Sequence, residues 1–460
     1  MRRTSRSLLL AVLLCAALTS RTFAATYAER VHEQVLPNGL KMLLLEDHKA
    51  PVAVFQIWYR VGSRNETLGR TGLSHLLEHM MFKGTEKVAP EDYSKIIQRN
   101  GGNTNAFTTQ DYTTYFATMA SDRLGVVNEL EADRLAHLKL AEEQFTPERQ
   151  VVMEERRLRT EDNPTSALFE SISAAAYTAH PYGWPVIGWM EDVRQLTLDD
   201  LTHYFHTYYV PNNALVVAVG DFDATQLAAQ IATEFGPIAA SAPPPPAVRA
   251  IEPAQQGERR VVLQREAQLP FVGVAYHVPN LHDGDAPAIE VLAGVLAGGK
   301  SSRLYHELVY RQRLAREVGG NADYVSVDPG VFMLYGQPLP GKKVGELEKA
   351  LLAEVTKLQI TPPSDREVEK AKNQIEASFI FGQDSDFYQG LVLGQYEIAG
   401  DWRLVDQYIP AMQAVTAADV QRVATKYLTA ANRTVGVLDP LPPRPGKRLP
   451  PAAPPPGMVR

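Results

Sequence analysis

Two histidines and a glutamate stand close together in the apolar segment from Gly72 to Phe82. Helical spacing would place His75 and His79 on one face, with Glu78 beside them. Neutral imidazoles are good ligands for a divalent zinc ion, and a nearby carboxylate can take a proton from water. The order His-x-x-Glu-His is the reverse of the better-known His-Glu-x-x-His helix. The segment therefore predicts a metal centre that activates water, with Glu78 as the base.

The alternative is that these residues are polar groups on an exposed helical face, or histidines satisfied inside a core. Burying them between Leu76, Leu77 and Met80 would be costly without a common partner. The metal interpretation is therefore favoured, and manganese or cobalt would suit the same ligands.

A catalytic zinc needs a third protein ligand, and a second helix is predicted to begin at Thr146, with Thr146 as its cap and Pro147 in the first turn. Glu148 and Glu155 are seven residues apart and share a face, whereas Glu154 points about 100° away. The spacing alone leaves Glu154 or Glu155 as the ligand. The alternative for either one is an ordinary solvated surface acid.

The first 24 residues have the layout of a secretory signal, with early arginines, an apolar stretch from Leu8 to Leu18 and small residues up to Ala24. We expect cleavage after Ala24 and a periplasmic or secreted protein. No later segment reaches about 18 uninterrupted apolar residues, so no permanent membrane span is expected. The single cysteine, Cys15, would be lost with the signal, which leaves His and carboxylates to hold any metal.

The charge balance argues against nucleic acid as a partner. Removing residues 1–24 takes away four arginines and no acidic residue, which changes the net charge from −7 to −11. A chain of this sign is poorly suited to binding phosphate backbones.

An internal repeat divides the chain. The stretch from Leu196 to Asn213 matches the stretch from Val415 to Asn432 at a constant offset, and each leads into an apolar strand. Paired strands followed by a helix also start both halves. We expect an α+β fold of two homologous halves, each a mostly antiparallel sheet with helices.

The repeat and the Pro-rich stretches set the expected boundaries. The expected segments are a signal peptide at 1–24, a metal-binding domain at 25–238, a Pro-rich linker at 239–257, a second domain without metal at 258–439 and a disordered Pro-rich tail at 440–460.

Four segments resemble the pitrilysin-type metallopeptidases, nearest to the mitochondrial processing peptidase and its bacterial relatives. They are His75 to Thr85, Gly101 to Phe116, Glu148 to Glu155 and His180 to Gly188, in the order and approximate spacing of that family. The resemblance covers nearly all of the mature chain.

This resemblance implies specific roles for particular residues. It selects Glu155 over Glu154 as the third ligand and makes Glu148 a residue that supports a ligating histidine. It also implies a clamshell of two halves around an extended peptide, which would lie along Asn105, Ala106 and Phe107 as an edge strand.

The chain also departs from the family pattern. Leu292, Val295 and Leu296 stand in the second half where the first half has His75, Glu78 and His79, so only one zinc ion per chain is expected. Active members use an Arg and a Tyr from a second half, and Val309 and Arg316 stand at those positions. One explanation is that Tyr305, Tyr310 and Arg311 substitute locally for the missing Arg and Tyr. The other explanation is a related subunit that completes the site in a homo- or heterodimer.

The resemblance therefore implies a zinc-dependent endopeptidase that acts on extended peptides or unfolded segments, with a related partner subunit for full activity. The alternative is a non-catalytic, metal-binding assembly subunit of a peptidase-like heterodimer. The intact set of His75, Glu78, His79 and Glu155 argues against that alternative.

Overall fold

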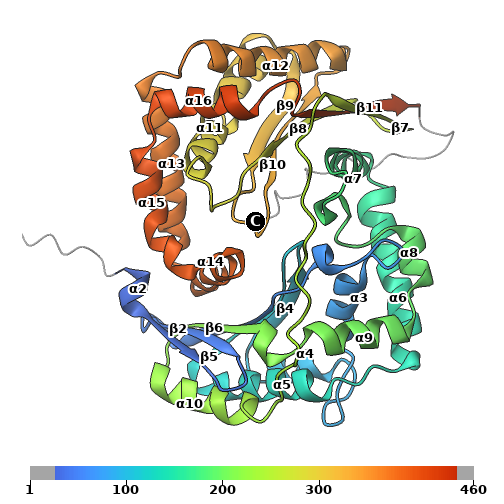
Figure 1. Ribbon diagram of the computed structural model, residues 1–460, viewed down its shortest axis with the longest axis vertical. Coiled ribbons are helices and arrows are strands. Elements are labelled where there is room, and N and C mark those ends of the chain that lie inside the picture. The colour runs from blue at the N-terminus through green and yellow to red at the C-terminus, as the bar shows by residue number, and fades with distance from the viewer. Residues whose placement is uncertain (1–25, 443–460) are drawn as a thin grey trace, which may run out of the picture.

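The computed structural model describes residues 26–442, which form two α+β halves that face each other in a clamshell (Figure 1). The predicted signal segment and nearly all of the predicted tail lie outside this range. None of the helices between residues 26 and 442 has both the length and the apolar content needed to cross a bilayer.

The first half is built on a six-stranded sheet in the order β1-β2-β6-β3-β5-β4. Only the β2–β6 pair is parallel. The strands are β1 (Val31–Val35), β2 (Lys41–Glu46), β3 (Val52–Tyr59), β4 (Asn103–Thr108), β5 (Thr113–Ala120) and β6 (Ala214–Gly220).

The second half is built on a five-stranded sheet in the order β7-β11-β8-β10-β9. Its strands are β7 (Arg259–Glu266), β8 (Phe271–Val278), β9 (Ala315–Ala322), β10 (Gly330–Pro338) and β11 (Arg433–Leu441). Strand β7 pairs in parallel with β11, as β2 does with β6, so the two sheets share one strand order from that pair onward. The predicted repeat of two mostly antiparallel α+β halves is confirmed.

Helices cover both sheets. In the first half they are α2 (Tyr27–Arg30), α3 (Leu73–Met80), α4 (Asp92–Arg99), α5 (Leu124–His137), α6 (Glu142–Arg156), α7 (Pro164–Ala176), α8 (Met190–Gln195), α9 (Leu198–Tyr208) and α10 (Ala224–Phe235). In the second half they are α11 (Ala286–Ala297), α12 (Val344–Ile360), α13 (Asp365–Gly382), α14 (Asp386–Ala399), α15 (Val405–Ala414) and α16 (Ala417–Tyr427).

Two predicted boundaries are wrong. The helix expected to begin at Thr146 begins at Glu142, so Pro147 lies inside α6. Glu142 and Glu143 favour this earlier start because acidic side chains are stabilised at the positive end of the helix dipole. Strand β11 continues to Leu441, beyond the predicted start of the tail, because Pro440 and Leu441 still pair with β7.

The halves exchange one helix each, which the sequence did not predict. Helix α7 of the first half packs on β7, β8 and β11, where Ile172 lies against Gly273 and Gly436. Helix α14 of the second half packs on β3 and β6, where Gly394 admits the ring of Trp58. The two halves therefore share their cores.

The loop between β9 and β10 also joins the halves. Asp328 on this loop contacts His180, at 3.0 Å, and Arg64. The Tyr182 hydroxyl donates to Asp111 at 2.6 Å and accepts from the Asp328 backbone N–H at 3.1 Å. The Asp111 carboxylate also accepts from the Val327 backbone N–H at 3.0 Å, so this loop is held by three segments of the first half.

Candidate metal centre

Helix α3 is positioned by an unusual N-terminal junction. Gly72 has a left-handed φ of 93° and lies against Gly188 of the loop before α8. The buried Glu66 carboxylate accepts from the backbone N–H groups of Gly72, at 2.7 Å, and Ser74, at 2.8 Å. Burial raises the pKa of Glu66 to about 8. These contacts satisfy donors that every helix start leaves open, and they fix where the histidines of α3 point.

Three candidate ligands meet where α3 packs on α6. One ligand atom each from His75, His79 and Glu155 lies within 4.8 Å of the others. The Glu155 Oε2 atom is 3.4 Å from His79 Nε2 and 3.8 Å from His75 Nε2. A tetrahedral zinc with bonds near 2 Å separates its ligand atoms by roughly 3.3 Å, so this donor set fits zinc.

Carboxylates from α6 determine how His79 is held. Its Nδ1 contacts Glu148 Oε1 at 2.8 Å, which turns Nε2 toward Glu155. Lys83 Nζ lies 2.7 Å from the other Glu148 oxygen. Glu148 is therefore placed to orient His79 and is not one of the three clustered ligands, in the arrangement typical of metal-bound histidines.

In the protein without metal, the pKa values of the two histidines are shifted in opposite directions. Burial, followed by the neighbouring His79, lowers the pKa of His75 to about 4. Burial also acts to lower the pKa of His79, but its hydrogen bonds to Glu148 and Glu155 outweigh that effect and raise it to about 9. His75 is therefore ready to coordinate at neutral pH, whereas His79 must first lose a proton.

Glu78 lies beside the ligand cluster and is held by β4. Its Oε2 accepts from the Thr108 hydroxyl at 2.5 Å, which leaves Oε1 free of that bond. Burial raises the pKa of Glu78, although the Thr108 hydrogen bond opposes the shift. A half-buried carboxylate with a raised pKa is suited to accept and return a proton.

The predicted peptide-binding residues lie on the outermost strand of the first sheet. Asn105, Ala106 and Phe107 belong to β4, which pairs with β5 on one side and forms the sheet edge on the other. Thr108 follows them directly and contacts Glu78, so this edge runs to the proposed base.

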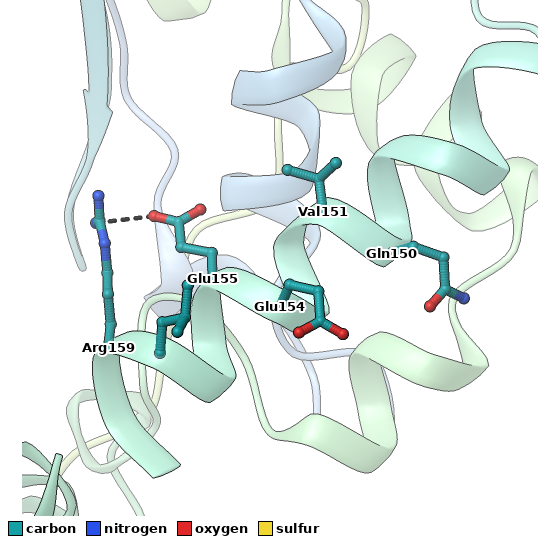
Figure 2. Close-up of a pocket in the computed structure, with 6 residues that line it drawn as sticks. Gln150, Val151, Glu154, Glu155 and Arg159 are labelled. Atoms are coloured by element: carbon teal, nitrogen blue, oxygen red, sulfur yellow. Dashed lines mark ion pairs between the residues drawn. The ribbon is translucent and has the colours of Figure 1, made fainter. Parts of the chain in front are cut away.

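A groove lies beside Glu155, whose side chain forms part of its lining. It is lined by Gln150, Val151, Glu154, Glu155, Leu158 and Arg159. Figure 2 shows Arg159 and Glu155 pointing toward one another, with Glu154 directed elsewhere. The Arg159 guanidinium contacts Glu155 Oε1 at 2.8 Å, on the oxygen that does not face the histidines.

Sequence reasoning missed three of these contact residues. Lys83 is four residues after His79, Arg159 is four residues after Glu155, and Thr108 follows the proposed peptide strand. The four-residue spacing from Glu155 could have indicated Arg159. Lys83 gave no such signal, because it lies beyond the end of α3 and contacts Glu148 of α6. Thr108 had no local signal because Glu78 lies 30 residues away in the chain.

The second half has no counterpart to this cluster within the described residues. Leu292, Val295 and Leu296 are buried apolar residues of α11. In the stretch from Val309 to Arg316, Arg313 adopts a left-handed φ of 47°. Arg311 is paired with Glu307, and Tyr310 is exposed.

Sequence profiles identify two adjoining segments. Residues 41–188 match the profile described as insulinase (peptidase family M16), and residues 195–375 match the profile described as peptidase M16 inactive domain. The first segment contains the complete cluster of candidate ligands, and the second contains the apolar α11.

Individual relatives match over most of their length. The zinc protease PqqE of Helicobacter pylori is 33% identical over 440 residues, which are 95% of this chain and 98% of that protein. The probable mitochondrial-processing peptidase subunit beta of Arabidopsis thaliana is 26% identical over 417 residues, 88% of this chain and 78% of that protein. The crystal structure of a protease from Helicobacter pylori has a TM-score of 0.87 and 32% identity, and the match covers 89% of this chain and all of that one.

Proposed function

The chain belongs to the insulinase family of peptidases, family M16, and from this premise we propose that it is a zinc-dependent endopeptidase acting on extended peptides or unfolded segments. The observation that supports this most directly is the convergence of His75, His79 and Glu155 within 4.8 Å, with Glu78 beside them. One zinc ion per chain is proposed, with these three residues as its ligands and Glu148 as their support.

In this proposal each group at the site has a separate role in catalysis or substrate binding. A zinc ion bound here supplies Lewis-acid polarisation and lowers the pKa of water. Glu78 Oε1 takes a proton from the attacking water and later delivers it to the leaving amine, while Thr108 holds Oε2. The substrate backbone pairs with the free edge of β4 along Asn105, Ala106 and Phe107, which leaves its sequence largely open.

Two further parts of the proposal concern partner and compartment. Val309 and Arg316 stand where active relatives have an Arg and a Tyr, and one relative is named as a subunit, so we propose that a related chain completes the site. The layout of residues 1–24 supports export. A purified mature chain that is monomeric and has the same turnover with and without a related subunit would contradict the partner proposal.

The catalytic proposal is tested by the variant Glu78→Gln. Peptide cleavage by the active assembly should fall by about 100-fold to 10,000-fold, the usual contribution of a general base, while zinc content stays at one per chain. Both are measured on the same preparation, by a quenched-fluorescence assay and by metal analysis.

Two neighbouring variants give the matched controls. Glu154→Gln, at the exposed neighbour, should retain both zinc and activity, whereas Glu155→Gln should lose zinc. Undiminished cleavage by Glu78→Gln would refute the assigned base, and undiminished zinc in Glu155→Gln would refute the assigned ligand.

A further inference from the structure

The groove beside Glu155 exposes apolar surface next to the proposed catalytic centre. It has a volume of about 540 Å³, and its lining side chains come from α6 and the π-helical turn Arg157–Glu161 that continues it. Val151 is 50% exposed and Leu158 is 68% exposed. π-Helical turns are rare and often occur at functional sites.

The two apolar side chains flank the candidate metal ligand on one helix face. Val151, Glu155 and Leu158 follow the spacing i, i+4 and i+7, so they share one side of the helix. A substrate side chain that covers Val151 and Leu158 removes apolar area from water, which favours binding. A peptide bound in this groove would therefore contact the apolar surface directly beside the candidate metal ligand Glu155.

Arg159 lines this groove and brings a positive charge next to Glu155. Its side chain is 74% exposed, and one nitrogen contacts Glu155 Oε1. The acidic neighbour Glu154 is paired with Arg157, which offsets its charge.

We propose that the groove is a specificity subsite that takes an apolar substrate side chain against Val151 and Leu158 and a substrate carboxylate at Arg159. This rests on the proposed peptidase function. The carboxylate comes from an Asp or Glu side chain or from a free peptide C-terminus, since guanidinium groups bind both in the same way. A purely structural Arg159 would orient Glu155 without distinguishing substrates.

The test compares selectivity ratios, which a general loss of zinc or of active enzyme leaves unchanged. After the cleaved bond is mapped in one peptide, each flanking residue is changed in turn between Glu and Gln, and between Leu and Ser. The C-terminus is compared as free acid and as amide. The wild-type chain should prefer one carboxylate-bearing peptide by about tenfold in kcat/KM, in the range of one charge-assisted contact.

Arg159→Gln should remove that preference, and Arg159→Glu should reverse it toward a Lys peptide. Leu158→Ser should lower the Leu-to-Ser ratio by about 10-fold and leave the carboxylate preference intact. Arg194→Gln is the matched control, because it removes an exposed arginine that is paired with the glutamate three residues before it and does not line the groove, and its ratios should equal those of the wild type.

Equal carboxylate preference in the wild-type chain and in Arg159→Gln would overturn the subsite, as would a wild-type chain with no preference. Peptide dissociation constants measured with zinc-loaded Glu78→Gln protein give the same comparison without turnover. A chain that binds with these preferences but never cleaves would contradict the proposed function and retain the subsite. A chain that cleaves peptides without these preferences would contradict the subsite and retain the proposed function.

Discussion

Glu154 and Glu155 are neighbours in the chain, but their carboxylates meet different surroundings. Glu154 is exposed and paired with Arg157, whereas Glu155 lies between two imidazoles and Arg159. The hydrogen bond to His79 lowers the pKa of Glu155, so this carboxylate is ionised at neutral pH. An ionised oxygen facing two ring nitrogens is the state that a divalent cation requires.

Glu148 should tune the metal through His79. The variant Glu148→Gln removes a charged acceptor from His79 Nδ1 and leaves Lys83 without its second carboxylate. Zinc affinity should fall by about 10-fold to 100-fold, the usual effect of losing a supporting carboxylate. Competition with a chromophoric chelator measures it, and Glu143→Gln, on the exposed start of the same helix, should bind as the wild type does.

Zinc binding should release one proton near neutral pH. With pKa values of about 4 for His75 and about 9 for His79, only His79 is protonated at pH 7 in the protein alone. Apparent zinc affinity should therefore rise about tenfold per pH unit between roughly pH 6.5 and 8.5. Calorimetry in buffers of different ionisation enthalpy counts the proton, and a pH-independent affinity would show that His79 is already neutral.

The raised pKa of His79 also affects the stability of the zinc-free protein, which should fall with rising pH, whereas zinc affinity should rise. The folded value lies above the ordinary value of 6.5, so protonated His79 stabilises the fold below about pH 6.5. That contribution is lost as the pH rises through about 9. Zinc and proton thus compete for one imidazole.

At the scale of elements, the junction before α3 decides where the histidines lie. A Cβ on Gly72 would meet Ile187 O at 2.8 Å, at a φ of +93° that side chains rarely adopt. Two glycines, Gly72 and Gly188, approach each other here because neither carries a side chain.

The variant Gly72→Ala should destabilise the protein by about 2–4 kcal/mol, since it adds a steric clash to left-handed strain. Gly69→Ala separates the two causes, because Gly69 also has a positive φ, 88°, but nothing lies within 4 Å of its Cβ position. It should cost only about 1–2 kcal/mol. Chemical denaturation measures both, and equal losses would mean that the contact with the Ile187 carbonyl has no effect.

At the scale of the molecule, the exchange of α7 and α14 makes each half a part of the other's core. Leu168 and Ile172 of α7 are buried against Phe271 and Tyr335 of the second half. Val392 and Leu393 of α14 are buried in a cluster with Trp58 of the first half. Because neither sheet is covered by its own half alone, we expect both halves to unfold together.

The variant Gly394→Ala tests this coupling, since its Cβ would lie 2.3 Å from the Trp58 ring. It should destabilise by about 1–3 kcal/mol, as overpacked cores do, and calorimetry should show a single transition at lower temperature. Gly345→Ala in α12 is the control, because nothing lies within 4 Å of its Cβ position. Two separated transitions in the Gly394 variant would contradict the shared core.

The sequence by itself determined what depends on local spacing. The helical period put His75, Glu78 and His79 on one side of α3, and put Glu148 and Glu155 on one side of α6. The repeat at constant offset predicted two α+β halves with matching sheets, because similar apolar patterns fold into similar elements.

Tertiary structure alone decided how those faces meet. Spacing left Glu154 and Glu155 as alternatives, and a family resemblance was needed to choose, because the answer depends on how α6 packs on α3 across a long stretch of chain. The Thr108 contact with Glu78, the groove at Arg159 and the exchanged helices arise in the same way. Periodicity fixes directions within one element, whereas distances between elements are set by packing, which no local pattern records.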